Sequence, residues 1–232
     1  MIKIGTAVAT TDTNLSFFLD DLYQKKLINY VELYLKPETK ISDLIFWNTF
    51  KFPIVLHAPH DSHASFKKDW VEFALWASKL VTNFQYVIFN AGLKGQGDIW
   101  QFGDLAYPEV MPQHTSFKEL SQFTVPDEVK GKFCLDFAHV YLTEQEYGMK
   151  NHSLTRLFLA KNPSHFHVGD ISNTTIDEYC PLGTGLLDLK WIIKELPLTC
   201  NVTIEVDPDV KDRKQSIEKD VLTFRESVLE KL

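Results

Sequence analysis

Eight short apolar runs that read as β-strands recur along this chain, and most of them end in a polar residue. The clearest are PIVLHAPH with His57, KFCLDFAH with Asp136 and His139, HFHVGD with His167, and NVTIEVD with Glu205. The runs alternate with segments of helical periodicity, which favours a parallel sheet, and eight such units favour a closed barrel. The carboxyl ends of barrel strands share one mouth, so we expect these polar residues to converge there.

The strand–helix units follow one another over the whole chain, and no linker, repeat or low-complexity segment divides it. We therefore expect an α/β fold with one domain over residues 1–232, a TIM-type barrel of eight β/α units. The sixth strand is expected within 132–142. The Gly-rich residues 92–104 leave no room for a full helix, so the fourth helical unit should be shortened. Other helices are expected near 15–26, 41–50, 67–81, 116–123 and 217–232.

Composition and charge narrow the class of protein. Hydrophobic residues make up 44% of the 232 residues and charged residues 24%, as in globular domains. The formal net charge of −7 disfavours nucleic acid as a partner. The N-terminus lacks the features of a signal peptide, and no apolar run approaches the roughly 20 residues that span a bilayer. Three cysteines without CxxC spacing are expected to be buried free thiols in a reducing cytoplasm: Cys134, Cys180 and Cys200.

Alternation along a strand predicts which side chains point into the barrel. In the sixth strand these are Cys134, Asp136 and Ala138, and in the last strand they are Thr203 and Glu205. A buried carboxylate without a partner is very costly, so several carboxylates among imidazoles require a cation or a proton network. The same alternation turns five further polar residues inward: Glu32, His57, Asn90, Glu109 and His167.

Four of these residues form the best candidate metal site: Glu109, Asp136, His167 and Glu205. A single Asp or His at a strand end is more often a structural residue, but four at the same end of successive strands favour function. Three carboxylates and one imidazole suit Mn²⁺, Mg²⁺ or Zn²⁺, and we expect Mn²⁺ or Zn²⁺.

The order of these segments resembles the xylose-isomerase-like TIM barrels, a superfamily that includes endonuclease IV and the sugar epimerases related to tagatose epimerase. Each segment is short, but their order and their position on strands are specific, and together they cover nearly the whole chain. The resemblance implies that the four candidate ligands hold a metal and that Glu109 and Glu205 also act as acid and base. The matching segments are YVELYL, VLHAPH, YPEVMP, LDFAH, HFHVGDIS, TIDEYCPLGTG and VTIEVD.

The resemblance to the endonucleases also implies further zinc ions near His57, His139 and Asp177, and here the chain departs from the pattern. Asn90 and Tyr179 stand where two histidines are expected. An amide or a phenol is a poor zinc ligand, so a trinuclear centre is not expected. Phosphodiester hydrolysis normally relies on two or more metal ions, whereas an isomerase needs one, so the remaining set favours an isomerase.

The chain also lacks the arginine that the related epimerases carry shortly after the metal histidine, since Asn173 stands there. The substrate or the reaction is therefore expected to differ. Gly183 and Gly185 precede a helix and form either an anion site or a tight turn. Substrate contacts are expected from the remaining polar residues of the mouth, namely Glu32, His57, His60, Asn90, His139 and Asp177.

We therefore expect a cytoplasmic, metal-dependent isomerase or epimerase that acts on a small sugar or related hydroxy-carbonyl compound by carboxylate-mediated proton transfer. Three alternatives remain open: a metal-dependent phosphodiesterase of the endonuclease IV type, a sugar-acid dehydratase of the same superfamily, and a non-catalytic barrel that binds a ligand. The expected partner is a small-molecule substrate, and the sequence is compatible with an oligomer.

Overall fold

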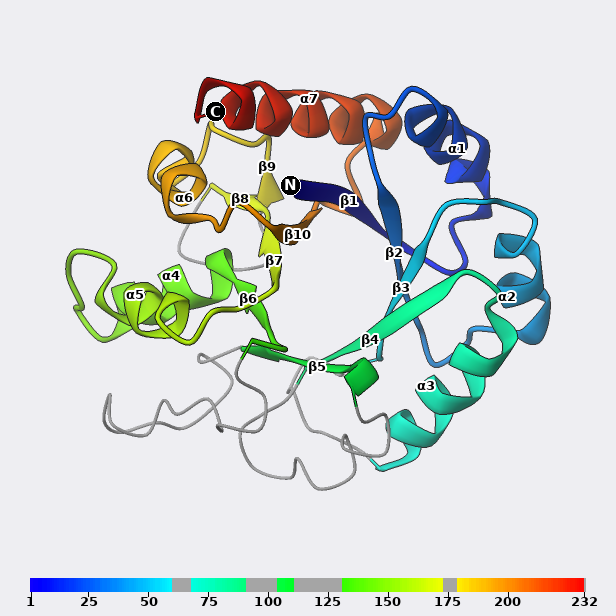
Figure 1. Cartoon of the computed structure of the whole chain (residues 1–232). Coiled ribbons are helices and arrows are strands. Elements are labelled where there is room, and N and C mark those ends of the chain that lie inside the picture. Colours follow the sequence, from blue (N-terminus) through cyan, green and yellow to red (C-terminus); the bar gives the residue numbers. More distant parts are fainter. Residues whose placement is uncertain (60–67, 91–103, 111–130, 173–178, 232) are drawn as a thin grey trace.

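A computed structural model describes residues 1–59, 68–90, 104–110, 131–172 and 179–231. Eight parallel strands close into a barrel, which confirms the expected α/β barrel (Figure 1). Polar residues from strands far apart in the sequence can therefore meet inside it. In order around the barrel the strands are β1 (Ile2–Ala9), β10 (Cys200–Ile204), β7 (His165–Val168), β6 (Cys134–Asp136), β5 (Ala106–Val110), β4 (Phe84–Asn90), β3 (Ile54–His57) and β2 (Tyr30–Tyr34).

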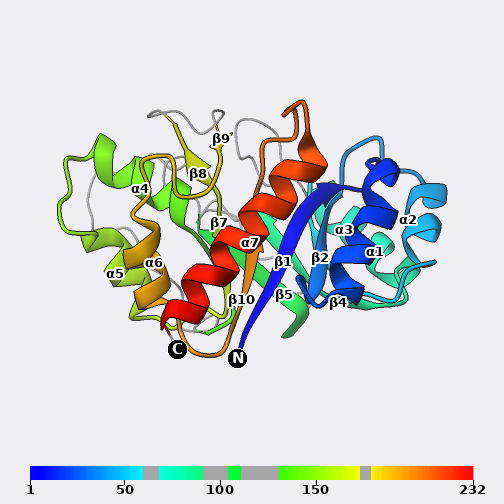
Figure 2. The same ribbon diagram turned by 90° about the horizontal axis from the view of Figure 1, so that it is seen from above.

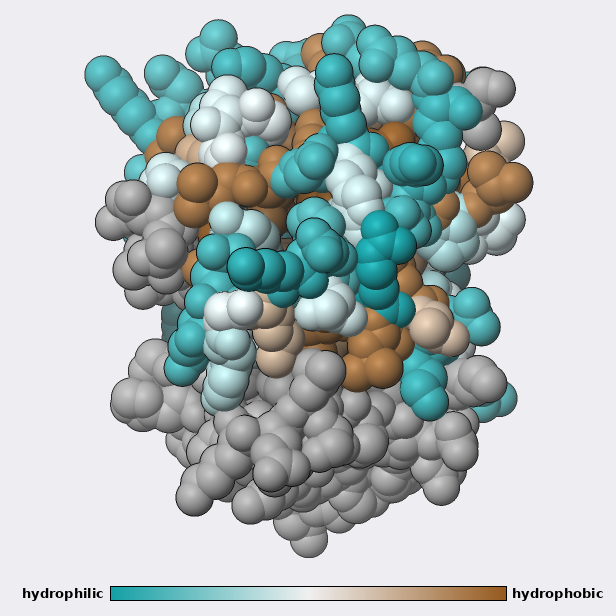
Figure 3. All heavy atoms as spheres, turned by 90° about the vertical axis from the view of Figure 1, so that its left-hand side faces the viewer, coloured by the Kyte–Doolittle hydropathy of each residue, from teal (hydrophilic) through white to brown (hydrophobic). Residues whose placement is uncertain are grey.

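Helices surround the barrel, and several lie where helical periodicity predicts them (Figure 1). Large apolar side chains such as Leu19, Trp47, Phe166 and Phe224 are fully buried in the main hydrophobic core. Where Figure 3 is coloured by hydropathy, hydrophilic side chains cover much of the face and hydrophobic ones show between them. The helical elements are η1 (Thr13–Leu15), α1 (Ser16–Gln24), α2 (Ile41–Trp47), α3 (Lys68–Leu80), α4 (Phe137–Glu146), α5 (Ser153–Leu159), α6 (Leu189–Glu195) and α7 (Arg213–Lys231).

The two ends of the barrel differ. Both chain termini lie at one end, and a two-stranded antiparallel sheet of β8 (Asp170–Ile171) and β9 (Tyr179–Cys180) lies at the other, where the barrel strands finish (Figure 2). β8 follows β7 directly but leaves the barrel. This small sheet therefore stands beside the mouth at which the polar strand ends were expected to meet.

The expectation of a long sixth strand is wrong, because β6 ends at Asp136 and α4 begins at Phe137. The Asp136 carboxylate accepts a hydrogen bond of 2.8 Å from the backbone N–H of His139, which is the capping geometry that starts a helix. Ala138 and His139 thus belong to the first turn of α4, and Ala138 is not an inward strand residue.

Two expected helical features fall outside the described residues: the shortened fourth unit, over 92–103, and the helix near 116–123. The described cysteines are free, with Cys134 and Cys200 buried and Cys180 partly exposed. Across the described ranges, no helix is both long enough and apolar enough to cross a membrane.

Candidate metal and proton-transfer site

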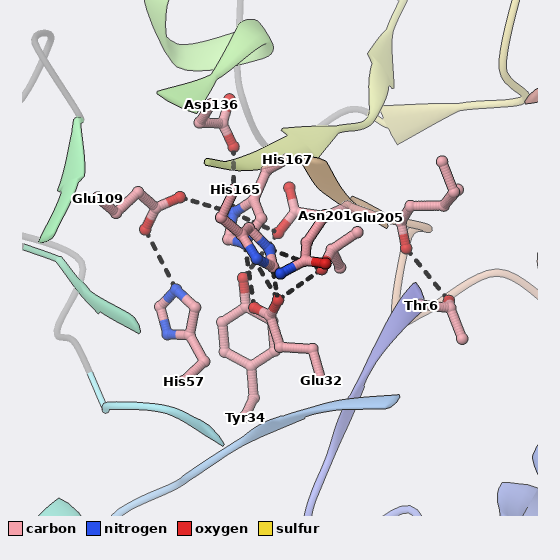
Figure 4. Close-up of polar contacts among 12 residues, drawn as sticks. Thr6, Glu32, Tyr34, His57, Glu109, Asp136, His165, His167, Asn201 and Glu205 are labelled. Carbon is pink, nitrogen blue, oxygen red and sulfur yellow. Dashed lines mark hydrogen bonds and ion pairs between the residues drawn. The ribbon is translucent and has the colours of Figure 1, made fainter. Parts of the chain in front are cut away.

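His167 is the centre of a buried polar cluster inside the barrel (Figure 4). Its Nδ1 atom lies 2.7 Å from Oε1 of Glu109, 3.4 Å from Oε1 of Glu205 and 3.7 Å from Oδ2 of Asp136. These carboxylates come from β5, from the residue after β10 and from the last residue of β6. Three of the four residues that were expected to bind a metal therefore converge on a ring nitrogen of the fourth, His167.

The other ring nitrogen of His167 faces Glu32, on β2. Nε2 lies 3.1 Å from Oε1 of Glu32, while Oε2 of Glu32 accepts a hydrogen bond of 2.6 Å from the hydroxyl of Thr203. An N–H on Nε2 that donates to Glu32 leaves Nδ1 as the nitrogen that can bind a metal. Metal-binding histidines in proteins commonly have this second partner, which fixes the orientation of the ring.

The donor set fits a divalent ion. Ligand atoms that share one ion at about 2.1 Å lie roughly 3.0–3.5 Å from one another, close to the separations around Nδ1 of His167. Asp136, His167 and Glu205 offer ligand atoms that all lie within 4.8 Å of one another, and so do Glu109, Asp136 and His139. Glu109, Asp136, His139 and His167 are buried, and about 10% of the Glu205 side chain is exposed. Glu109, Asp136, His167 and Glu205 would hold the ion.

The carboxylates of the cluster differ in acidity. Burial raises the pKa of Glu205 to about 7, and the charges of Asp136 and Glu109 add to this against the opposing effect of His167. Burial likewise raises the pKa of Asp136. Burial also opposes ionisation of Glu109 and Glu32, but neighbouring histidines together outweigh it and lower the pKa of both. His167 acts with His57 on Glu109 and with His165 on Glu32. One carboxyl that titrates near neutrality beside an ionised one is a pairing suited to acid–base catalysis.

In the metal-free protein both ring nitrogens of His167 carry a proton, so the imidazole is positively charged. Burial lowers its pKa, but the acidic groups around it, Cys134 and the carboxylates of Glu32, Glu205 and Glu109, outweigh burial and raise the pKa well above its usual value. The proton on Nδ1 then occupies the position in which a metal ion would bind. Metal binding is therefore expected to release a proton.

His57 extends the cluster on the side of β3. Its Nε2 atom lies 3.1 Å from Oε2 of Glu109, and its Nδ1 atom lies 2.9 Å from the carbonyl oxygen of Ala58. Glu109 thus bridges two imidazoles, one on each oxygen. The ring of Tyr34 stacks on His57 at 4.1 Å between centroids. His57, expected to bind substrate, is in direct contact with an expected metal ligand.

Of the other expected substrate-binding residues, two are buried in the cluster and the rest fall wholly or partly outside the described residues. Glu32 lies fully buried beneath His167, and His139 is buried on α4 next to Asp136. Asn90 is the last residue of β4 and pairs in register with Glu109, but its side chain lies outside the described part. Two more expected contacts also lie outside it, His60 and Asp177.

Two residues of the cluster, His165 and Tyr34, were not identified from the sequence, and the contact that Tyr179 makes with Glu205 was not expected either. His165 lies two residues before His167, so alternation along HFHV places both rings on the inner face; its Nε2 lies 3.3 Å from Oε2 of Glu32. Tyr34 follows Glu32 by two residues in the same way. Tyr179 reaches Glu205 from β9, and no local pattern predicts that contact.

The glycine turn before α6 holds a carboxylate of the chain itself. The backbone N–H groups of Gly183 and Gly185 each donate to Oδ2 of Asp170 at 2.9 Å, and that of Leu187 donates to Oδ1 at 3.1 Å. The structure thus supports the tight-turn alternative. Asp170 fills the place that an external anion would take.

Comparisons with known proteins agree with this architecture. No protein-family model and no curated protein matches the sequence. Among solved structures, endonuclease IV from Thermus thermophilus matches with a TM-score of 0.63 and 12% identity, over 98% of this chain and 99% of that chain. A D-tagatose 3-epimerase-like protein matches with a TM-score of 0.56 and 15% identity, over 99% of each chain.

A D-psicose 3-epimerase from Clostridium cellulolyticum, crystallised with D-tagatose, has a TM-score of 0.59 and 12% identity, over 97% of this chain and 99% of that chain. At such low identity the likeness establishes the fold. The resemblance to the xylose-isomerase-like TIM barrels is thereby confirmed for the architecture, which this chain shares with both an endonuclease and epimerases.

Proposed function

We propose that this protein is a metal-dependent isomerase or epimerase that acts on a small sugar or a related hydroxy-carbonyl compound. The observation that carries the proposal is the convergence of Glu109, Asp136 and Glu205 on Nδ1 of His167. When bound by these four residues, Mn²⁺ or Zn²⁺ would polarise the carbonyl and a neighbouring hydroxyl group of the substrate. The shared fold with D-psicose 3-epimerase supports this class of substrate.

Glu109 and Glu205 are the proposed proton-transfer pair. They come from β5 and from the end of β10, which are separated in the barrel by β6 and β7. One carboxylate takes the proton from the carbon beside the carbonyl, and the electrons of that bond move to the carbonyl oxygen. The other carboxylate returns a proton to carbon. In the metal-free protein the pKa of Glu205 is raised to about 7 and that of Glu109 is lowered, so Glu205 is the more basic of the two carboxylates.

Solvent exchange tests the proposal. Incubation of the protein with candidate ketoses and Mn²⁺ in deuterated water should place deuterium on the carbon next to the carbonyl. Glu205→Gln should abolish the exchange, because an amide cannot accept the proton. Glu226→Gln, which makes the same change at an exposed position on α7, is the matched control and should exchange normally. Exchange that persists in Glu205→Gln would exclude Glu205 as the base, and a wild type inactive on every ketose would contradict the proposal.

A phosphodiesterase activity is the second candidate, favoured by one observation. Glu109, Asp136 and His139 form a further buried group whose ligand atoms lie within 4.8 Å of one another, so a second ion could share two carboxylates with the first. Phosphodiester hydrolysis commonly uses two ions. Cleavage of abasic-site DNA, together with two bound metal ions per chain that fall to one in His139→Gln, would support this candidate. The net charge of −7 speaks against it.

A further inference from the structure

Both oxygens of the Glu205 carboxylate accept hydrogen bonds from tyrosine hydroxyls. Tyr34 donates to Oε1 at 2.7 Å, and Tyr179 donates to Oε2 at 3.1 Å. A carboxylate has no hydrogen to donate, so each phenol hydroxyl is the donor.

Tyr34 is fixed from two directions. It is the last residue of β2, and alternation puts it on the same inner face as Glu32. Its ring stacks on His57 with an interplanar angle of 25°. A phenol held on a barrel strand and against a second ring has little freedom to move its hydroxyl away from Glu205.

Tyr179 approaches Glu205 from outside the barrel, on β9. Its ring lies directly against Gly169, the residue between β7 and β8. A Cβ at position 169 would overlap the Tyr179 ring and would lie 3.2 Å from Cβ of Glu205. The absence of a side chain at Gly169 is therefore what lets the phenol reach the carboxylate.

The small sheet that carries Tyr179 is itself anchored. β9 pairs with β8, where Ile171 is the partner of Tyr179. The neighbouring residue of β8, Asp170, binds the backbone N–H groups of Gly183 and Gly185. The glycine turn thus holds the sheet in place, and through it the Tyr179 hydroxyl.

We propose that Tyr34 and Tyr179 are positioning residues that clamp the Glu205 carboxylate, a role that rests on the function proposed above. With one hydroxyl on each oxygen, the carboxylate cannot rotate about its terminal bond. Oε1 stays 3.4 Å from Nδ1 of His167, within the ligand set, and each oxygen keeps a lone pair for the metal or for a proton. At the position where the endonuclease pattern expects a zinc-binding histidine, this chain has a phenol that orders Glu205 instead.

Tyr34→Phe and Tyr179→Phe test the clamp, because each removes one hydroxyl and keeps the ring. The matched control is Tyr107→Phe on β5, whose ring stacks on Tyr86. Affinity for Co²⁺ is measured by competition with a chelator, and the visible absorption spectrum of the Co²⁺ protein reports the ligand geometry. Each clamp variant is expected to weaken Co²⁺ binding about tenfold and to change the spectrum, whereas the control changes neither.

The same Tyr→Phe substitutions in a Glu205→Gln background show whether the hydroxyls act by positioning Glu205 or only by packing in the protein interior. If the hydroxyls act through Glu205, they should add little further loss of Co²⁺ affinity once the carboxylate is gone. An equal loss in both backgrounds, or wild-type affinity and spectrum in both Phe variants, would overturn the proposal. Gly169→Ala, whose Cβ would overlap the Tyr179 ring and lie 3.2 Å from Cβ of Glu205, should weaken Co²⁺ binding at least as much as Tyr179→Phe does.

Urea unfolding of the metal-free protein distinguishes this inference from the proposed function. The shifts of the unfolding midpoint in Tyr34→Phe and Glu205→Gln should not add up in the double variant, because the residues share a hydrogen bond. A wild type that binds no Co²⁺ would contradict the proposed metal-dependent function, while non-additive midpoints would still support the clamp. Additive midpoints would overturn the clamp whatever the metal result.

Discussion

Nε2 of His167 lies 3.1 Å from Oε1 of Glu32, with both side chains fully buried inside the barrel. Glu32 also interacts with His165 and Thr203, so its carboxylate is held from several directions. This contact turns the opposite nitrogen of His167 toward Glu109 and Glu205. The residue that orients the candidate metal site thus lies on β2, on the far side of the imidazole from the expected ligands.

Glu32→Gln should weaken metal binding without removing a ligand. The amide cannot accept from both imidazoles and Thr203 as the carboxylate does, so His167 loses the partner that orients it. The expected loss of Mn²⁺ affinity is roughly 10–100-fold, measured by competition with a chelator. Glu38→Gln, an exposed position shortly after β2, is the control and should bind as the wild type does. Equal affinity in all three proteins would remove this role from Glu32.

Asp136→Asn and Asp136→Ala should separate the two roles of Asp136. The carboxylate is an expected metal ligand, and it also caps α4 through the N–H of His139. Asparagine is as good a helix cap as aspartate, so Asp136→Asn should lose metal content but keep the cap, whereas alanine should cost about 1 kcal/mol more. Elemental analysis of protein purified without chelator and urea unfolding measure the two effects. Full metal content in both variants would exclude Asp136 as a ligand.

Stability of the metal-free protein should fall as pH rises from about 5 to 8. The pKa of Glu205 is raised from an ordinary value of 4.5 to about 7, so the folded state binds this proton more tightly than the unfolded state does. That contribution is fully present below pH 4.5 and is lost as pH rises through about 7. The pKa of His167 is also raised, so its contribution to stability is likewise lost as pH rises, but at a higher pH.

Urea unfolding midpoints across this range, in the presence of chelator, check the prediction. Glu205→Gln should show a weaker dependence on pH than the wild type because the glutamine does not titrate. Mn²⁺ should reverse the trend in the wild type, since an ion binds the ionised carboxylate better at higher pH. Midpoints that change with pH in chelator equally in the wild type and in Glu205→Gln would contradict the raised pKa of Glu205.

Sequence patterns predicted the parts of the site that depend on strand periodicity. Alternation placed Glu32, His167 and Glu205 on the inner face, because the side chains of a strand alternate strictly. It also placed Asp136 correctly but failed for Ala138, because a capping hydrogen bond to Asp136 ends β6 there and the apolar residues that follow suit a helix as well as a strand. The approach of Tyr179 to Glu205 depends on where β9 pairs, and that is set by tertiary contacts.

Asp170→Asn should destabilise the protein more than its position beside the barrel suggests. The carboxylate accepts four backbone N–H groups, two on each oxygen, from Ile171, Gly183, Gly185 and Leu187. The asparagine side chain has an NH₂ group in place of one carboxylate oxygen. Two of the four backbone N–H groups therefore lose their acceptor and face another donor. Unsatisfied buried donors cost about 1–3 kcal/mol each, so the loss of two acceptors should lower the free energy of unfolding by roughly 2–6 kcal/mol.

Asp188→Asn is the matched control for Asp170→Asn, measured in the same urea titration. Asp188 caps α6 by accepting only the N–H of Trp191 among the described residues, and asparagine caps a helix as well as aspartate does, so its free energy of unfolding should change by less than about 0.5 kcal/mol. Because Asp170 anchors the sheet that bears Tyr179, Asp170→Asn should also weaken Co²⁺ binding as Tyr179→Phe does. If Asp170→Asn unfolds at the same urea concentration as Asp188→Asn and binds Co²⁺ normally, the glycine turn does not hold Tyr179 in place.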